Sequence, residues 1–199
     1  MYYGKKGYMH FLHVYGVEVK NKTYLFIILC VILDRLQITM FYKVASHCLF
    51  RKKKKLKFNE LHLSAELLAE IDKAGFVEAS PIQEQTIPLA MAGKDVIGQA
   101  QTGTGKTAAF GFPTLEKINT ENPDVQALVI APTRELAVQS QEELFRFGRS
   151  KGVKVRSVYG GSSIEKQIKA LRSGAHIVVG TPGRLLDLIK RKALKLNHV

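Results

Sequence analysis

The sequence predicts an α/β domain in which a parallel β-sheet is flanked on both faces by helices. Short apolar runs alternate four times with stretches of helical periodicity. The runs are continuously apolar, which is typical of strands buried on both faces of a parallel sheet. The four predicted strands lie within residues 95–98, 126–131, 153–159 and 176–180.

Composition and charge separate an N-terminal segment from a globular part. Of the 199 residues, 46% are hydrophobic, which is enough to build a core. Residues 1–57 hold 12 Lys/Arg against 2 Asp/Glu, whereas residues 58–199 hold 18 against 15. The net charge of +13 is therefore no evidence that the globular part binds nucleic acid. Cys30 and Cys48 have no metal-ligand spacing, which indicates a reducing, cytoplasmic location and no structural zinc.

We treat residues 1–55 as an N-terminal extension with an apolar run at 24–33 and a basic run at 51–55. The apolar run is shorter than the about 20 residues that span a bilayer, and no convincing cleavage site follows it. Three interpretations stay open: a non-native or poorly folding extension, a peripheral membrane or partner-binding segment, and a true signal or span. The basic run fits a solvated linker better than a contact to RNA or anionic lipid.

The globular part begins with two helices whose starts and ends are marked in the sequence. Ser64 is a suitable N-cap for the first helix, and Gly75 follows its end. The segment Ser80-Pro81-Ile82-Gln83 has the pattern of a capping box with proline at the first helical position. We expect Pro88 to bend this second helix.

A glycine-rich segment, Asp95-Val-Ile-Gly-Gln-Ala-Gln-Thr-Gly-Thr-Gly-Lys-Thr107, then predicts a strand, a tight loop and a helix start. Backbone N–H groups of small residues can surround a phosphate, and a helix N-terminus adds the positive end of its dipole. An incidental glycine-rich turn is the alternative, and Ala100 stands where the general phosphate-loop pattern has glycine. Predicted phosphate-binding residues are Ala100, Gln101, Thr102, Gly103, Thr104, Gly105, Lys106 and Thr107, with the Thr107 hydroxyl holding Mg²⁺.

Three later loops also follow predicted strands and start helices. Thr133 is expected to cap a helix that runs to about Arg149, and residues 162–165 form a further capping box. Thr181 starts the last helix. Ligands gather at the carboxyl ends of strands in parallel sheets, so we expect four loops along one edge of the domain. These loops are 100–107, 131–134, 159–162 and 180–184.

In this order the motifs resemble those of the first RecA-like domain of a DEAD-box RNA helicase of the bacterial type. The resemblance covers residues 56–199, with a Q-motif region at 56–84 and an ATP-binding region at 85–199. The Q motif is resembled by Phe58, Phe76 and residues 80–83. Residues 100–107 resemble motif I, in which this family accepts alanine at the position of Ala100. Residues 132–137 resemble motif Ia, Gly160-Gly161 resembles the glycine pair, and residues 181–184 resemble motif Ib.

The resemblance implies ATP and Mg²⁺ as cofactors and RNA as a partner. Gln83 would pair with the edge of adenine, and Phe58 would stack on the base. Capping by Gln83 and a core contact by Phe58 are alternative roles compatible with these. Which ribosome or RNA-degradation partners the protein meets is not encoded in these motifs.

The resemblance also implies residues that hold the backbone of single-stranded RNA without base specificity. Arginines at helix starts oppose the helix dipole, which indicates a nearby anion. The alternative roles are helix capping by the threonines and solvated charges at the arginines. The implied RNA-binding residues are Pro132, Thr133, Arg134, Gly160, Gly161, Thr181 and Arg184.

The sequence reaches Val199 without the Asp-Glu-Ala-Asp motif of this family. In the family, we expect the strand that bears this motif to lie beside the phosphate-loop strand. Because its acidic residues do not occur in this sequence, Lys106 and Thr107 are the only catalytic residues predicted here. The chain is therefore expected to bind ATP weakly and to show no RNA-stimulated hydrolysis, as a catalytically incomplete fragment. Two other functions stay open: a different P-loop NTPase, such as a small kinase, and a non-catalytic RNA-binding fragment.

Overall fold

The computed structural model of the chain describes residues 56–199. The apolar run at 24–33 and the basic run at 51–55 lie outside the described residues, so the interpretations of the N-terminal extension stay open. Within residues 56–199, every helix is too short or too polar to cross a bilayer.

Three parallel strands form the sheet, in the spatial order β1-β3-β2. Ile130 of the first strand and Val158 of the second both lie opposite Gly180 of the third, so all three strands end at the same level. The predicted parallel sheet between helices is confirmed. The strands are β1 (Ala127–Ile130), β2 (Val155–Val158) and β3 (Ile177–Gly180).

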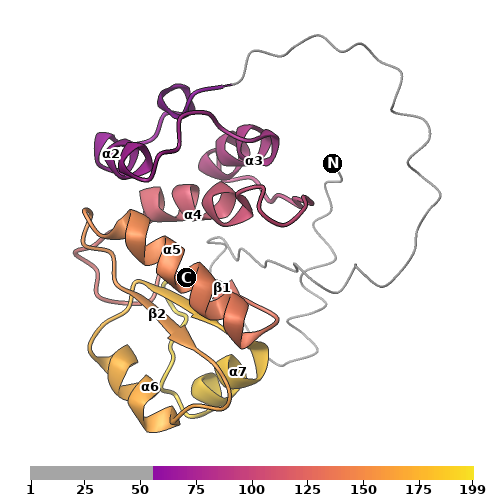
Figure 1. Cartoon of the computed structure of the whole chain (residues 1–199). Coiled ribbons are helices and arrows are strands. Elements are labelled where there is room, and N and C mark those ends of the chain that lie inside the picture. The colour runs from indigo at the N-terminus through magenta and orange to yellow at the C-terminus, as the bar shows by residue number, and fades with distance from the viewer. Residues whose placement is uncertain (1–55) are drawn as a thin grey trace, which may run out of the picture.

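Helices cover both faces of this sheet (Figure 1). On one face α5 lies against the strands, α4 packs on α5, and α2 and α3 lie beyond (Figure 1). On the other face lie α6 and α7 (Figure 1). The helices are η2 (Phe58–Leu61, a 3-10 turn), α2 (Ala65–Lys73), α3 (Pro81–Met91), α4 (Lys106–Lys117), α5 (Arg134–Gly148), α6 (Ile164–Arg172) and α7 (Pro182–Lys190).

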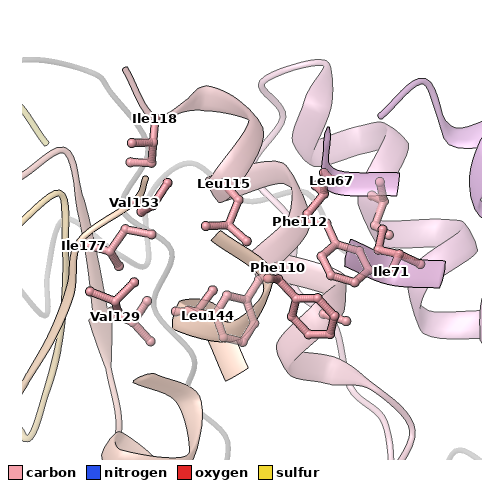
Figure 2. Packing of buried hydrophobic residues seen from close by; sticks show 14 of the residues in the cluster. Leu67, Ile71, Phe110, Phe112, Leu115, Ile118, Val129, Leu144, Val153 and Ile177 are labelled. Atoms are coloured by element: carbon pink, nitrogen blue, oxygen red, sulfur yellow. The ribbon is translucent and has the colours of Figure 1, made fainter. Parts of the chain in front are cut away.

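The central strand β3 is buried on both sides, as its continuous apolar sequence predicts. Ile177 and Val179 belong to the core cluster shared with α4 and α5, whereas Val178 belongs to the cluster under α6 and α7. This alternation follows from the two-residue period of a strand. Figure 2 shows Ile177 and Val129 facing the side chains of α4 and α5, including Leu115 and Leu144.

The first predicted strand, at residues 95–98, is wrong: this segment has no regular secondary structure. A strand needs a hydrogen-bonded neighbour, and within residues 56–199 the sheet offers none next to this segment. Ile97 is consequently 55% exposed. A cavity of about 290 Å³ lies next to β1 and is lined by residues of α3, α4 and β1, such as Ala90, Lys117 and Leu128.

Most predicted helix starts are found, with two changes. The hydroxyls of Ser64 and Thr133 accept hydrogen bonds from the first turns of α2 and α5. The N-cap of α6 is Ser163 rather than Ser162, because the Ser163 hydroxyl accepts from the Lys166 N–H at 3.2 Å. Thr181 occupies the N-cap position of α7, but its hydroxyl makes no capping hydrogen bond.

His176 precedes β3 and is 2% exposed, with its Nδ1 accepting from the backbone N–H of Lys154 at 3.0 Å. Burial, and secondarily the charge of Lys154, lowers the pKa of His176. Below pH about 6.5 the unfolded chain therefore binds a proton that the folded chain rejects. The free energy of unfolding should fall as the pH drops below that value. At higher pH the residue is neutral in both states and contributes no slope.

We predict that His176→Asn reduces this acid loss of stability, since Asn keeps an acceptor at this position and does not titrate. Urea unfolding between pH 5 and 8 measures it, with pH values chosen around about 6.5. His62→Asn is the matched control, because His62 is exposed and has a left-handed φ of 56° that Asn tolerates. Equal pH slopes in His176→Asn and the unaltered chain would contradict this role for His176.

Candidate functional site

The predicted phosphate loop turns sharply into α4. Gly103 and Gly105 adopt positive φ angles of 77° and 80°, in the left-handed region that favours glycine. Gly105 is the N-cap of α4, and no side chain caps this helix. The first N–H groups of α4 thus have no side-chain acceptor, which is the arrangement that favours an anion at a helix start.

Gln83 fixes this loop from the start of α3. Its Oε1 accepts from the Ser80 N–H at 2.8 Å, completing the predicted capping box, and its Nε2 donates to the Gly105 carbonyl at 3.1 Å. The Ser80 hydroxyl donates to the Thr104 carbonyl at 2.8 Å. The Gln83 side chain is 2% exposed, whereas Ser80, Thr104 and Gly105 are partly exposed, so these bonds are partly buried. Two side chains of the Q-motif region therefore hold consecutive carbonyls of the phosphate loop.

Lys106 and Thr107, the predicted catalytic residues, lie at the first turn of α4, where the sequence predicts a helix start. The Lys106 ammonium folds back and donates to the Ala100 carbonyl. Lys106 and Thr107 are both partly exposed. Among residues 56–199, no group of three or more His, Cys, Asp or Glu side chains is arranged to hold a metal ion. Thr107 is the one metal ligand predicted from the sequence, and its binding of Mg²⁺ stays a prediction.

Phe58 lies in the core. It is 3% exposed and makes edge-to-face contacts with Phe76 and Phe112, at centroid distances of 6.2 and 5.7 Å. This is the core contact named as its alternative role. Its stacking on adenine, and the pairing of Gln83 with adenine, stay predictions.

The loops that follow β1, β2 and β3 are joined directly. The Ala131 N–H donates to the Gly180 carbonyl at 2.9 Å, and the Thr181 N–H donates to the Val158 carbonyl at 3.1 Å. The predicted common edge therefore holds for three of the four loops. No hydrogen bond found within residues 56–199 joins them to the phosphate loop, so the placement of the fourth loop stays a prediction.

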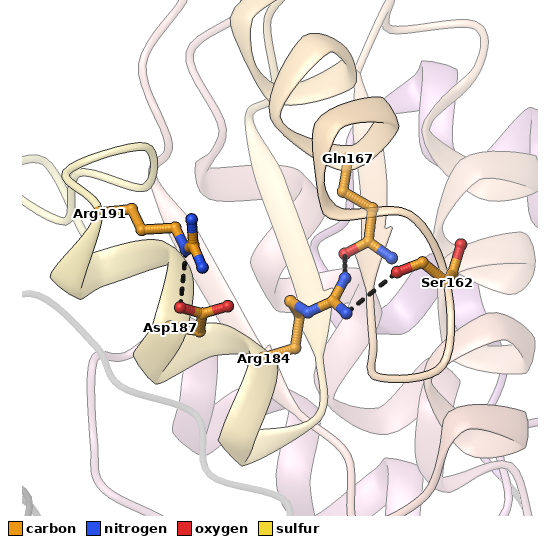
Figure 3. Close-up of polar contacts among 5 residues, drawn as sticks. All are labelled: Ser162, Gln167, Arg184, Asp187 and Arg191. Atoms are coloured by element: carbon orange, nitrogen blue, oxygen red, sulfur yellow. Dashed lines mark hydrogen bonds and ion pairs between the residues drawn. The ribbon is translucent and has the colours of Figure 1, made fainter.

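Both predicted RNA-binding arginines contact the loop after β2. The guanidinium of Arg134 lies over the ring of Tyr159, 4.8 Å from its centroid. Arg184 Nη1 donates to Gln167 Oε1 at 2.8 Å, and its Nη2 donates to the Ser162 carbonyl at 3.0 Å. Figure 3 shows Arg184 reaching from α7 to these two residues. One loop thus positions arginines from two helices.

The remaining predicted RNA-binding residues are accessible. Pro132, Thr133, Gly160 and Gly161 are exposed, and Thr181 is partly exposed. The Thr181 hydroxyl makes no capping bond, and its contact with RNA stays a prediction. Tyr159, Ser162 and Gln167 were missed by the sequence prediction as contacts of the arginines. Gln167 gives the one signal that could have been used, since it lies on the same helical stripe as Ile164 and Leu171.

Fold and site together define a P-loop nucleotide-binding domain: a parallel sheet between helices, with a glycine loop that leads into α4. The family model described as DEAD/DEAH box helicase matches residues 80–199. The chain belongs to this family.

Curated relatives and solved structures agree. The chain is 89% identical over 144 residues to the DEAD-box ATP-dependent RNA helicase CshA of Streptococcus pneumoniae. The matched region covers 72% of this chain and 28% of that protein. It is 58% identical to CshA of Bacillus subtilis, over 72% of this chain and 29% of the relative. The chain thus spans less than a third of the length of these relatives.

Two solved structures show the same fold. A DEAD box protein from the hyperthermophile Methanococcus jannaschii has a TM-score of 0.69 and 44% identity, covering 72% of this chain and 39% of that one. Saccharomyces cerevisiae Dbp5 bound to RNA and ADP BeF3 has a TM-score of 0.65 and 38% identity, covering 72% of this chain and 36% of that one. The chain therefore has the fold of a RecA-like domain of this family.

We predict that Gly105→Ala destabilises the protein more than Gly103→Ala. Both changes place a side chain at a positive φ, at a cost of about 1 kcal/mol. A Cβ at Gly105 would also lie 2.2 Å from Gln83 Nε2, whereas one at Gly103 meets nothing within 4 Å. Displacing the buried amide adds its lost hydrogen bonds and overpacking, for a total of about 3 kcal/mol.

Urea unfolding of the two variants measures this difference, with Gly103→Ala as the matched control in the same loop. Equal losses of unfolding free energy in both variants would show that the contact between Gln83 and Gly105 contributes nothing to stability.

Proposed function

We propose that this chain is the ATP-binding and RNA-binding first domain of a DEAD-box RNA helicase. Membership of the family and the likeness to a relative bound to RNA and ADP BeF3 support the two ligands. The observation that carries the proposal is the phosphate loop, whose uncapped helix start and left-handed glycines leave N–H groups for an anion. We assign the full helicase reaction to proteins of the full length of the relatives, and to this chain only the binding of the two ligands.

In this proposal, the loop residues 100–105 surround the phosphates of ATP, and the Lys106 ammonium leaves the Ala100 carbonyl to bind them. Gln83 reads the adenine edge with the hydrogen-bonding capacity that its two present bonds leave unused. The Thr107 hydroxyl holds Mg²⁺, which supplies positive charge to neutralise the phosphates.

RNA binding is assigned to the edge formed by the loops after the three strands. Arg134 and Arg184 supply positive charge, while Thr133 and Thr181 supply hydroxyls at helix starts. Such groups suit sugar-phosphate backbone and carry no base specificity. We further propose a cytoplasmic location, in keeping with two cysteines that have no metal-ligand spacing.

Lys106→Ala is expected to weaken ATP binding about tenfold or more, because the variant loses a charge-assisted hydrogen bond to phosphate. Calorimetric titration of the chain with ATP and Mg²⁺ measures the effect. Lys94→Ala is the matched control, since Lys94 is exposed and lies before the phosphate loop. Equal ATP affinity in the unaltered chain, Lys106→Ala and Lys94→Ala would contradict the proposed nucleotide site. Tighter binding of GTP than of ATP would contradict the role of Gln83.

The same preparations test the proposed lack of turnover. Because the chain contains no Asp-Glu-Ala-Asp, we expect no ATP hydrolysis above background, with or without single-stranded RNA. Phosphate release measured by a coupled assay decides this. RNA-stimulated turnover that disappears in Lys106→Ala would show that the chain carries a complete catalytic site.

A further inference from the structure

Gln167 is a buried amide on α6 whose two ends are both engaged. The residue is 8% exposed. Its Nε2 donates to the Tyr159 carbonyl at 3.0 Å, and its Oε1 accepts from Arg184 Nη1 at 2.8 Å. A carbonyl at the end of β2 is thereby connected through one side chain to an arginine of α7. In Figure 3 the Gln167 oxygen faces Arg184, beside the loop that contains Ser162.

The hydrogen-bond partners of Arg184 are neutral, which distinguishes it from Arg191 at the C-cap of α7. Arg191 Nε donates to the Asp187 carboxylate at 2.8 Å, forming an ion pair. None of the ion pairs found within residues 56–199 involves Arg184. The Glu165 carboxylate is close enough for Arg184 to help lower its pKa, but its main partners are its own backbone N–H and the Ser163 hydroxyl. Arg184 is thus held in place while its charge stays available.

The two hydrogen bonds leave part of the guanidinium unused. Arg184 is partly exposed and donates from one position on Nη1 and one on Nη2. A guanidinium has further N–H groups in the same plane, and these suit a phosphate oxygen. Both acceptors belong to the segment between the end of β2 and the first half of α6, and Ser162 directly follows the exposed Gly160-Gly161 pair in the chain.

We propose that Gln167 is a positioning residue for binding of the RNA backbone: it holds the Arg184 guanidinium in a fixed orientation beside the Gly160-Gly161 loop. The inference rests on the proposed function, because it takes RNA phosphate as the ligand of Arg184. Gln167 touches no RNA in this arrangement. It acts only through Arg184.

The physical effect is on conformational entropy. A free arginine side chain loses rotamer freedom when it binds a phosphate, whereas one already fixed by two hydrogen bonds loses little. A neutral amide suits this role, because a carboxylate at the same place would compete with phosphate for the guanidinium. Loss of the amide should therefore weaken RNA binding by about three- to tenfold, with the charge of Arg184 intact.

The test uses the full chain and a short fluorescein-labelled single-stranded RNA, with affinity measured by fluorescence anisotropy at fixed low salt. Gln167→Met keeps the length of the side chain and removes both hydrogen bonds. Its effect is measured in the unaltered chain and again in an Arg184→Met background. Gln139→Met is the matched control, because Gln139 is an exposed glutamine on α5.

A positioning role predicts that Gln167→Met weakens RNA binding three- to tenfold in the unaltered chain and has no further effect once Arg184 is Met. A merely structural role predicts the same loss in both backgrounds and would overturn the inference. So would an unchanged affinity in Gln167→Met, while the RNA site itself would stand if Arg184→Met weakens binding. If Arg184→Met leaves binding unchanged, both the inference and the proposed RNA contact of Arg184 fail.

Folding of each variant is checked by thermal unfolding and by ATP titration, because the phosphate loop shares no hydrogen bond with Gln167. If Gln167→Met does not fold, Gln167→Asn replaces it in the same cycle. Asn keeps a polar amide but is one methylene too short to reach both partners, so the same outcomes decide.

Discussion

The hydrogen-bonded register of β3 with both of its neighbours is the constraint on which the rest of the site depends. Because Ile130 and Val158 lie opposite Gly180, three loops start at one level. The backbone continues the ladder by one residue on each side, at Ala131 and Thr181. Helix starts carrying Arg134 and Arg184 are thereby brought to a common edge. A shift of β3 by one residue would move Ile177 and Val179 out of the cluster they share with α4 and α5 and Val178 out of the cluster under α6 and α7.

The phosphate loop is held differently, because no strand precedes it. Its position depends on α3, from which Ser80 and Gln83 hold the carbonyls of Thr104 and Gly105. The capping box that starts α3 thus has a second use. Its glutamine satisfies the helix start with one end of the amide and the loop with the other. In this structure, Ser80 and Gln83 therefore support the predicted phosphate loop directly.

Elements with strong local signals could be predicted from the sequence. The strands at β1, β2 and β3 have continuous apolar sequences, and Ser64 and Thr133 cap helices as expected, because each signal involves neighbouring residues. Residues 95–98 have a similar apolar start, yet they form no strand, because a strand also requires a partner that local sequence does not reveal.

In the candidate site, too, local features could be predicted from the sequence and contacts between distant residues could not. The glycines and Lys106 of the phosphate loop could be identified because the motif is contiguous. The contacts of the arginines could not, since Arg134 meets Tyr159 and Arg184 meets Gln167 only after the sheet has formed. Thr181 makes no capping hydrogen bond for a related reason. The sequence predicts the N-cap position, but it does not determine which partner the hydroxyl of that residue binds.

The arginines at the starts of α5 and α7 lie where the helix dipole disfavours positive charge. Each is instead stabilised by groups without a formal charge, the ring of Tyr159 for Arg134 and the oxygens of Gln167 and Ser162 for Arg184. A protein that needed these arginines only for stability would gain more by pairing them with carboxylates, as α7 does for Arg191 and Asp187. Neutral partners fix the direction of each guanidinium, and neither arginine takes part in an ion pair found within residues 56–199. That combination suits a surface whose ligand brings the negative charge.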